Sequence, residues 1–194
     1  AYAYRDNGVP YSFMITWIRT GISKPKDYDE EMIKGIFKDG ELGKDGIYTP
    51  GEDDDTDVGD TPNIIFLQLE SFVDPTIVKD MEYSQDPVPN FRRMVKEYSS
   101  GALTVPAVGA GTANVEFEAI TGISARFFGP GEYPNKSVLT EKTCESTAFD
   151  LKQVGYSAHA IHNHRGAFYN RNTVFKNLGF DTFTCLEYMN NVMK

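Results

Sequence analysis

The stretch that decides the fold is Val108–Gly122, which reads VGAGTANVEFEAITG. Gly109 and Gly111 precede Thr112, and an amphipathic run ending in a further glycine follows at once. This pattern predicts a helix over residues 112–121 with a hydroxyl in its first turn. The start of a helix presents unpaired backbone N–H groups, which favour an alkoxide or a phosphoryl oxygen. Thr112 is therefore either a nucleophile or an ordinary N-cap threonine.

A second stretch, Asn63–Ser71, reads NIIFLQLES. Its apolar run over residues 64–69 predicts a short, buried parallel strand, and Glu70 follows directly. In open α/β sheets, functional groups gather beyond the C-terminal ends of the strands. A carboxylate is a hard oxygen ligand that suits Mg²⁺ or Mn²⁺. Glu70 is thus a candidate metal ligand, and the alternative is an exposed glutamate at a strand end.

The surrounding sequence alternates between helical and strand patterns from residue 61 onward. Such alternation indicates crossover connections and a mostly parallel sheet, so we expect an α/β fold. Glycines follow several of the expected helices, as is typical of helix ends. The expected helices are 89–98, 146–154 and 172–178, and the expected strands are 64–69, 101–105, 158–162 and 180–184.

Residues 1–60 differ in character from residues 61–194, and we expect two segments. An apolar, aromatic run at 11–19 predicts a short surface helix or the end of an apolar segment. A helix is predicted at 29–37, with Asp29 as its N-cap and acids in its first turn. The acidic run 51–57 is typical of a solvated linker, because it lacks the ligand spacing of a calcium loop.

Composition excludes some classes of function. The chain has 194 residues, 40% of them hydrophobic, and a net charge of −9, so a broad nucleic-acid surface is not expected. No run approaches the ~20 apolar residues of a membrane span. The two cysteines, Cys144 and Cys185, have no zinc-site spacing, and either a disulfide or two free thiols is compatible with their positions.

A third stretch, His162–Arg171, reads HNHRGAFYNR and follows a predicted strand. Arginine binds phosphate oxygens through a planar fork, and histidine can donate a hydrogen bond or a proton. An aromatic ring such as that of Tyr169 can cover the apolar side of a small polyol. We interpret this loop as a recognition site and His159, on the strand before it, as structural.

Taken together and in this order, the three stretches resemble the lipoteichoic acid synthase-like phosphoglycerol transferases of the sulfatase branch of the alkaline phosphatase superfamily. The resemblance covers about Pro62 to Phe183. It implies a three-layer α/β/α domain with a mostly parallel sheet, here truncated on its C-terminal side. It also implies that residues 1–60 link this domain to a membrane region outside the chain. The catalytic domain would then lie on the outer face of the membrane, as in a Gram-positive-type envelope.

The resemblance also implies roles for five residues. Glu70 would be a metal ligand, and Thr112 both a ligand and the nucleophile that carries a glycerol-phosphate intermediate. His162, Tyr169 and Arg171 would bind the glycerol phosphate. The metal would be Mn²⁺ or Mg²⁺, phosphatidylglycerol the donor, and a polyglycerolphosphate or a glycolipid the acceptor.

The chain holds only part of the metal site of the family. The family completes its metal site with an Asp-His pair and a further His, which we expect beyond Lys194, so the chain alone is expected to be inactive. An open sheet edge would also favour self-association. Two alternatives remain: another metal-dependent phosphodiesterase or phosphoethanolamine transferase of the superfamily, or a non-catalytic binding module.

Overall fold

The computed structural model describes residues 8–18, 22–36, 41–42, 48–49, 61–69, 72–106, 111–129 and 131–189. The chain divides into two compact units. One unit comprises residues 63–105, and the other comprises the remaining residues on both sides of it. The division expected from the sequence, with a boundary near residue 60, stays a prediction.

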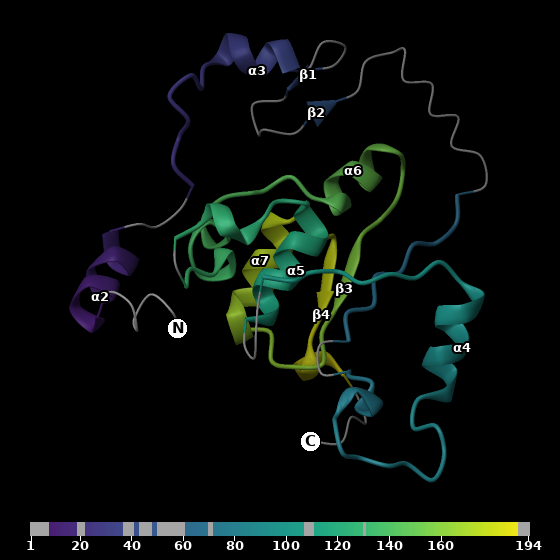
Figure 1. The fold of residues 1–194 in the computed structure, drawn as a ribbon. Helices are drawn as coiled ribbons and strands as arrows, with labels where there is room; N and C mark the ends of the chain where they lie inside the picture. Colours follow the sequence, from purple (N-terminus) through teal and green to yellow (C-terminus); the bar gives the residue numbers. More distant parts are fainter. Residues whose placement is uncertain are drawn as a thin grey trace. The chain divides into compact units, whose positions relative to one another are not determined.

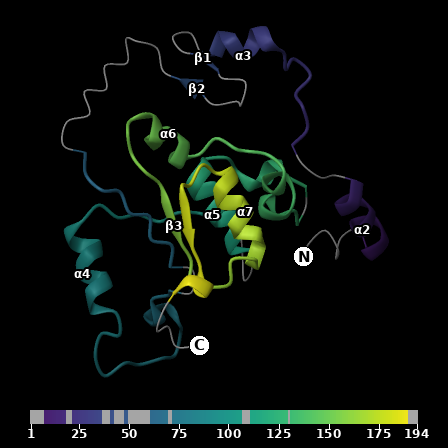
Figure 2. The ribbon, with the colours of Figure 1, turned by 180° about the vertical axis from the view of Figure 1, so that it is seen from behind.

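The larger unit holds the parallel sheet of the fold, formed by β3 (His159–Ile161) and β4 (Thr182–Thr184). Helix α7 (Arg171–Asn177) connects the two strands, as expected of a crossover unit. Helix α5 (Thr112–Thr121) and helix α6 (Thr147–Gln153) belong to the same unit, and α5 and α7 lie beside the strand pair (Figures 1 and 2). The predicted α/β class with a parallel sheet is confirmed.

The core of this unit is apolar and draws on α5, α7 and β3, with Phe183 of β4 packed against it. Leu139 and Val174 are fully buried, and Phe117 meets Phe128 edge-on with ring centroids 5.4 Å apart. The 3-10 segments close the core from the side. The buried cluster is Phe117, Phe128, Leu139, Ala160, Val174, Phe175 and Leu178. The 3-10 segments are Ala125–Phe127, Pro134–Lys136, Val138–Thr140, Phe168–Asn170 and Leu186–Tyr188.

A hydroxyl begins α6 and a glycine follows α7. The Ser146 hydroxyl caps α6 by accepting from the backbone N–H groups of Ala148 and Phe149, and it donates to the carbonyl of Leu178 at 2.6 Å. Gly179 follows α7 with φ +84°, and a Cβ there would lie 2.8 Å from the ring of Phe149. Only glycine combines this conformation with this close approach.

The N-terminal part contains two helices and a short hairpin, each described here by itself. Helix α2 spans Val9–Ile18, which confirms a helix in the aromatic run. Helix α3 spans Glu30–Ile36, and the Asp29 carboxylate accepts from Met32 N at 2.7 Å, as an N-cap should. Strands β1 (Glu41–Leu42) and β2 (Tyr48–Thr49) pair antiparallel within the expected linker. The acidic run 51–57 lies outside the described residues.

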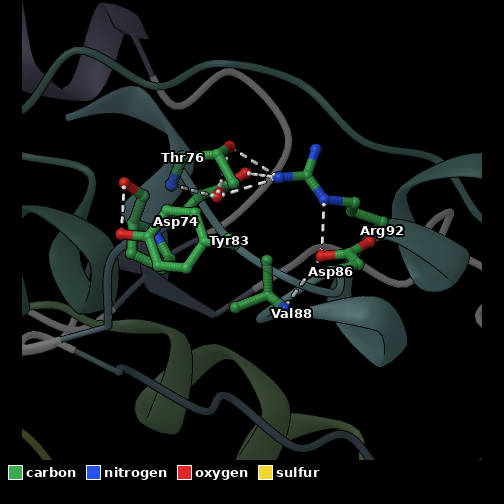
Figure 3. A network of polar contacts seen from close by, with 7 residues as sticks. Asp74, Thr76, Tyr83, Asp86, Val88 and Arg92 are labelled. Atoms are coloured by element: carbon green, nitrogen blue, oxygen red, sulfur yellow. Dashed lines mark hydrogen bonds and ion pairs between the residues drawn. The ribbon is translucent and has the colours of Figure 1, made fainter. Parts of the chain in front are cut away.

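The smaller unit contains helix α4 (Pro89–Glu97) and a 3-10 turn at Pro75–Ile77, joined by a polar network (Figure 3). The Arg92 guanidinium donates to Asp74 at 2.7 Å and to Asp86 at 3.0 Å. Asp74 also accepts from the Thr76 hydroxyl at 2.7 Å. Phe72 and Phe91 add an edge-on ring contact at 4.9 Å. The predicted helix 89–98 is therefore confirmed.

Two predicted strands are not formed. Residues 64–69 and 101–105 have no strand hydrogen bonding in the described chain. Ile65, Phe66 and Leu67 are 85, 69 and 75% exposed, and Leu103 is 82% exposed. A strand is stable only where a neighbour completes its ladder and side chains bury its face, and neither condition is met within the described residues. The prediction of these two strands is wrong for this structure.

Both cysteines are free thiols, Cys185 buried and Cys144 partly so, which answers the question left open by their spacing. Within the described part of the chain, no helix is long and apolar enough to cross a membrane.

Candidate functional site

Thr112 is the first residue of α5, and Gly111 occupies the N-cap position before it. Gly111 is buried and left-handed, with φ 101° and ψ 29°, a conformation that glycine adopts without strain. Its carbonyl accepts from Asn114 N at 2.9 Å and so begins the helix. The alternative of an N-cap threonine is therefore wrong, because Thr112 stands one position further in. Its partly buried side chain projects from the first turn of the helix.

The first turn of α5 also carries a buried oxygen without a partner. Asn114 donates through Nδ2 to the carbonyl of Glu132 at 3.3 Å, while its Oδ1 has no hydrogen-bond partner within the described chain. Thr112 and Asn114 thus supply hard oxygen atoms of the kind that Mg²⁺ and Mn²⁺ prefer. The chemistry of this turn is compatible with a divalent ion.

The other predicted ligand is not described. Glu70 and Gly109 lie outside the described residues, so the role of Glu70 as a metal ligand stays a prediction. Within the described residues, no three His, Cys, Asp or Glu side chains gather as a metal cluster would require.

His162 lies at the end of β3, where its N–H donates to Thr184 O at 2.9 Å and extends the ladder with β4. The turn that follows is closed by imidazole rings. The N–H of His164 donates to His162 Nδ1 at 3.1 Å, and the N–H of Arg165 donates to His164 Nδ1 at 2.8 Å. Since Nδ1 of His162 is an acceptor, its neutral ring carries the hydrogen on Nε2. That nitrogen is the one able to donate to a ligand.

Tyr169 and Asn170 are both left-handed, with φ 57° and 54°. This is common for asparagine and costly for a bulky aromatic residue, so surrounding contacts must hold the turn. The Tyr169 ring lies 5.5 Å from that of Tyr133 and 4.6 Å from that of Phe168. Lys136 Nζ lies 4.9 Å from the centre of the Tyr169 ring, within cation–π range. The turn therefore presents an aromatic surface next to a cation.

Arg171 is 2% exposed and forms a buried ion pair with Glu116 of α5. Its Nη2 donates to Glu116 Oε2 at 3.0 Å, and its Nε lies 3.2 Å from the same oxygen. Its Nη1 donates to the carbonyl of Phe168 at 3.3 Å. Because a guanidinium has five N–H donors, two remain beyond these three. Arg171 thus joins the recognition loop to the helix that begins at Thr112.

Charges at this junction affect each other. Burial raises the pKa of Glu116, while the Arg171 charge and its hydrogen bond oppose that rise. Burial also lowers the pKa of His162, and the positive charge of Arg171 and then His164 lower it further. Both shifts follow from burial, which disfavours the charged form; the Arg171 cation opposes the shift of Glu116 and adds to that of His162. His162 is therefore held toward its neutral form.

The structure thus brings three of the predicted site residues into one region. His162, Tyr169 and Arg171 lie on one loop, and Arg171 is tied through Glu116 to the helix of Thr112. Glu116 was missed as a site residue, although it follows Thr112 by four positions and so shares its helix face.

Lys136 and Tyr133 were also missed. They reach the Tyr169 ring from a separate 3-10 segment, and no sequence periodicity connects that segment to the loop.

A comparison with known families matches residues 62–194 to the sulfatase family. The chain belongs to the sulfatase family. The resemblance drawn from the three sequence stretches is thereby confirmed at the level of the family, and the α/β fold agrees with it.

Two individual proteins are similar to this sulfatase-family chain. One, from Rhizobium meliloti (strain 1021), is named for the modification of cyclic beta-1,2-glucan and is 34% identical over 191 residues, which is 98% of this chain. The other is the lipoteichoic acid synthase LtaP from Listeria monocytogenes, for which a crystal structure is known. That structure aligns with 46% of this chain, with a TM-score of 0.39 and 23% sequence identity. The chain spans 27% of the length of the first protein and 22% of the second.

Proposed function

We propose that the protein carrying this chain is a phosphoglycerol transferase. It moves glycerol phosphate from phosphatidylglycerol to a polyglycerolphosphate or glycolipid acceptor, with Thr112 as the nucleophile. The observation that supports this most directly is the Glu116–Arg171 pair. It joins the helix that starts at Thr112 to a loop with phosphate-binding and polyol-covering side chains. Membership of the sulfatase family and the glucan-modifying name of the Rhizobium protein agree with a saccharide-type acceptor.

The reaction consists of two displacements at phosphorus. The Thr112 oxygen forms a bond to the phosphorus of the donor, the bond to the diacylglycerol oxygen breaks, and diacylglycerol leaves as the alcohol with a proton. An acceptor hydroxyl then attacks the same phosphorus and loses its proton, and Thr112 regains its hydroxyl hydrogen. The positive end of the α5 dipole, at the start of the helix, stabilises the charged oxygens.

The recognition loop orients the glycerol phosphate. His162 donates from Nε2 to a phosphoryl oxygen, and its lowered pKa keeps it neutral at pH 7. Arg171 holds the loop in place through Phe168 O and Glu116, and Tyr169 covers the glycerol carbons. Positioning of this kind accounts for much of the rate of a phosphoryl transfer.

Sulfatase-family enzymes are metal-dependent. We propose that Thr112 and Glu70 hold Mn²⁺ or Mg²⁺ together with ligands from the rest of the protein. When bound, such an ion lowers the pKa of a hydroxyl and neutralises phosphoryl charge. We further propose that this domain lies on the outer face of the cell membrane, where its lipid donor is found.

The test uses the complete protein with Mn²⁺ and phosphatidylglycerol vesicles, and it measures diacylglycerol release and a glycerol-phosphate adduct on the Thr112 peptide. Thr112→Ala is expected to lower release by about a thousandfold or more and to abolish the adduct. Chelation of the metal should have the same effect, reversed by added Mn²⁺. Thr121→Ala, at the other end of α5 where the hydroxyl donates to Phe117 O and accepts from Ile123 N, is the control and should retain activity.

Other outcomes would identify the alternatives. Full activity of Thr112→Ala would contradict the nucleophile assignment. Release that requires only water as acceptor, or that prefers phosphatidylethanolamine, would favour the phosphodiesterase or phosphoethanolamine transferase. Lipid binding without any turnover by the complete protein would favour a binding module.

A further inference from the structure

We propose that Glu116 is a positioning residue for the transfer reaction. Its carboxylate balances the charge of Arg171 and fixes the Phe168–Arg171 turn against the first two turns of α5. This inference rests on the proposed function, because it assigns to Glu116 a role in the same site. It follows from the contacts of the pair, the strain in the turn and the position of Glu116 relative to Thr112.

Glu116 stands four residues after Thr112, so the two side chains lie on one face of α5, one helical turn apart. Its carboxylate accepts from Nε of Arg171 through Oε1 at 3.3 Å and from Nη2 through Oε2 at 3.0 Å. Two parallel bonds between planar groups define the relative orientation of both as well as their distance. The orientation of Arg171 is therefore set by the helix that carries the nucleophile.

Arg171 in turn holds the strained part of the loop. Its Nη1 donates to Phe168 O, and its guanidinium carbon lies 5.7 and 5.4 Å from the ring centres of Phe168 and Tyr169. Tyr169 has φ 57°, which costs free energy and persists only where neighbours hold it. The Glu116–Arg171 pair supplies that constraint, so the ring of Tyr169 has a fixed place relative to α5.

The pair also sets the charge of the site. Arg171 is 2% exposed, and an unbalanced guanidinium in that position would be strongly unfavourable. With Glu116 ionised, the pair is neutral, so the anionic donor meets no net charge from it. Replacement of Glu116 by glutamine would add one positive charge. It should therefore favour anion binding while loosening the geometry.

This reasoning predicts a distinctive kinetic result for the complete protein. Glu116→Gln should lower kcat by about ten- to a hundredfold, while KM for phosphatidylglycerol stays equal or falls. Glu116→Asp, which keeps the charge, should recover part of the loss. Glu118→Gln is the matched control, since Glu118 accepts from Ser124 Oγ and Ala125 N. It disturbs the same helix away from Arg171, so both kcat and KM should stay at the wild-type values.

A second measurement needs no turnover. The charged groups that act on His162 in the described chain are Arg171 and His164. In the 194-residue chain, an NMR titration of the His162 ring should give a lower pKa in Glu116→Gln than in wild type, because the Arg171 charge is no longer balanced. Glu118→Gln should titrate as wild type.

The outcomes separate the two proposals. If the wild-type complete protein transfers no glycerol phosphate, the proposed function fails, and the titration still tests Glu116. An unchanged His162 titration in a folded Glu116→Gln chain, or a kcat within about twofold of wild type, would overturn the role of Glu116. If that variant does not fold, the double variant Glu116→Gln/Arg171→Gln replaces it, since it buries no unpaired charge. A wild-type kcat in the double variant would likewise contradict the inference.

Discussion

At the scale of single residues, the Glu116–Arg171 pair matters for the arrangement of the site more than for stability. The desolvation that raises the pKa of Glu116 exceeds the attraction of Arg171, so the pair is weak evidence for stability. The same pair has a clear geometric effect, because it links two elements 55 positions apart in the chain. A buried ion pair of this kind contributes specificity of arrangement rather than net free energy.

His162 should make the stability of the folded chain depend on pH. Its pKa is lowered in the folded chain by burial, Arg171 and His164, so the unfolded chain binds the proton more readily. Stability from this group is present above its unfolded pKa of about 6.5 and is lost as the pH falls through the lower, folded value. Urea unfolding of the 194-residue chain should therefore show a contribution from His162 to the free energy of unfolding that rises as the pH increases toward about 6.5.

His162→Gln should remove the contribution of His162 to the slope of unfolding free energy against pH. His159→Gln is the control, since His159 lies outside the loop and bonds Thr182 and Ser157, and the slope assigned to His162 should persist in it. Equal slopes in wild type and His162→Gln would show that His162 does not titrate between the two states as described.

At the scale of elements, helix α4 shows how a short helix with an exposed apolar face is held. Phe91, Met94 and Val95 are each more than 40% exposed, so burial contributes little. The Arg92 network ties α4 to the Pro75–Ile77 turn, and hydrogen bonding by Thr76 and the charge of Arg92 lower the pKa of Asp74. The attachment of α4 is thus mainly polar.

Arg92→Met should therefore lower amide hydrogen-exchange protection in α4 by roughly a factor of ten. Arg93→Met is the matched control on the same helix. It removes only an exposed i, i+4 pair with Glu97 and should change protection by less than about twofold. Similar losses in the two variants would mean that the Asp74–Arg92 contact does not hold the helix.

At the scale of the whole molecule, the exposed apolar run over residues 64–69 predicts self-association. Ile65 and Leu67 are 85 and 75% exposed, and the backbone around them has no ladder partner in the described chain. Unpaired extended segments with apolar side chains tend to pair with other copies. In sedimentation velocity, the 194-residue chain should sediment faster as its concentration rises from about 5 to 100 µM.

The double variant Ile65→Lys/Leu67→Lys should abolish this concentration dependence. Tyr188→Lys replaces an equally exposed side chain, 76% exposed, outside the run and should leave it unchanged. A wild-type chain that stays monomeric over the whole range would contradict the prediction.

The sequence by itself determined the local features. The α5 boundaries, the cap of α3 and the parallel pairing around α7 follow from glycines, a capping carboxylate and apolar spacing, which act over a few residues. The family also followed from three stretches read in order. The strands at 64–69 and 101–105 could not be decided this way, because a strand depends on a neighbour that local sequence does not specify.

Only the tertiary structure decided which groups meet at the site. The sequence placed Thr112 and Arg171 in separate motifs and treated Arg171 as a free phosphate-binding group. The fold buries Arg171 against Glu116 and sets Lys136 over Tyr169. Such contacts join residues far apart in the chain, and burial then changes the charge they present to a ligand. Residue type therefore indicated the chemistry of the site, while packing determined which charges are available to it.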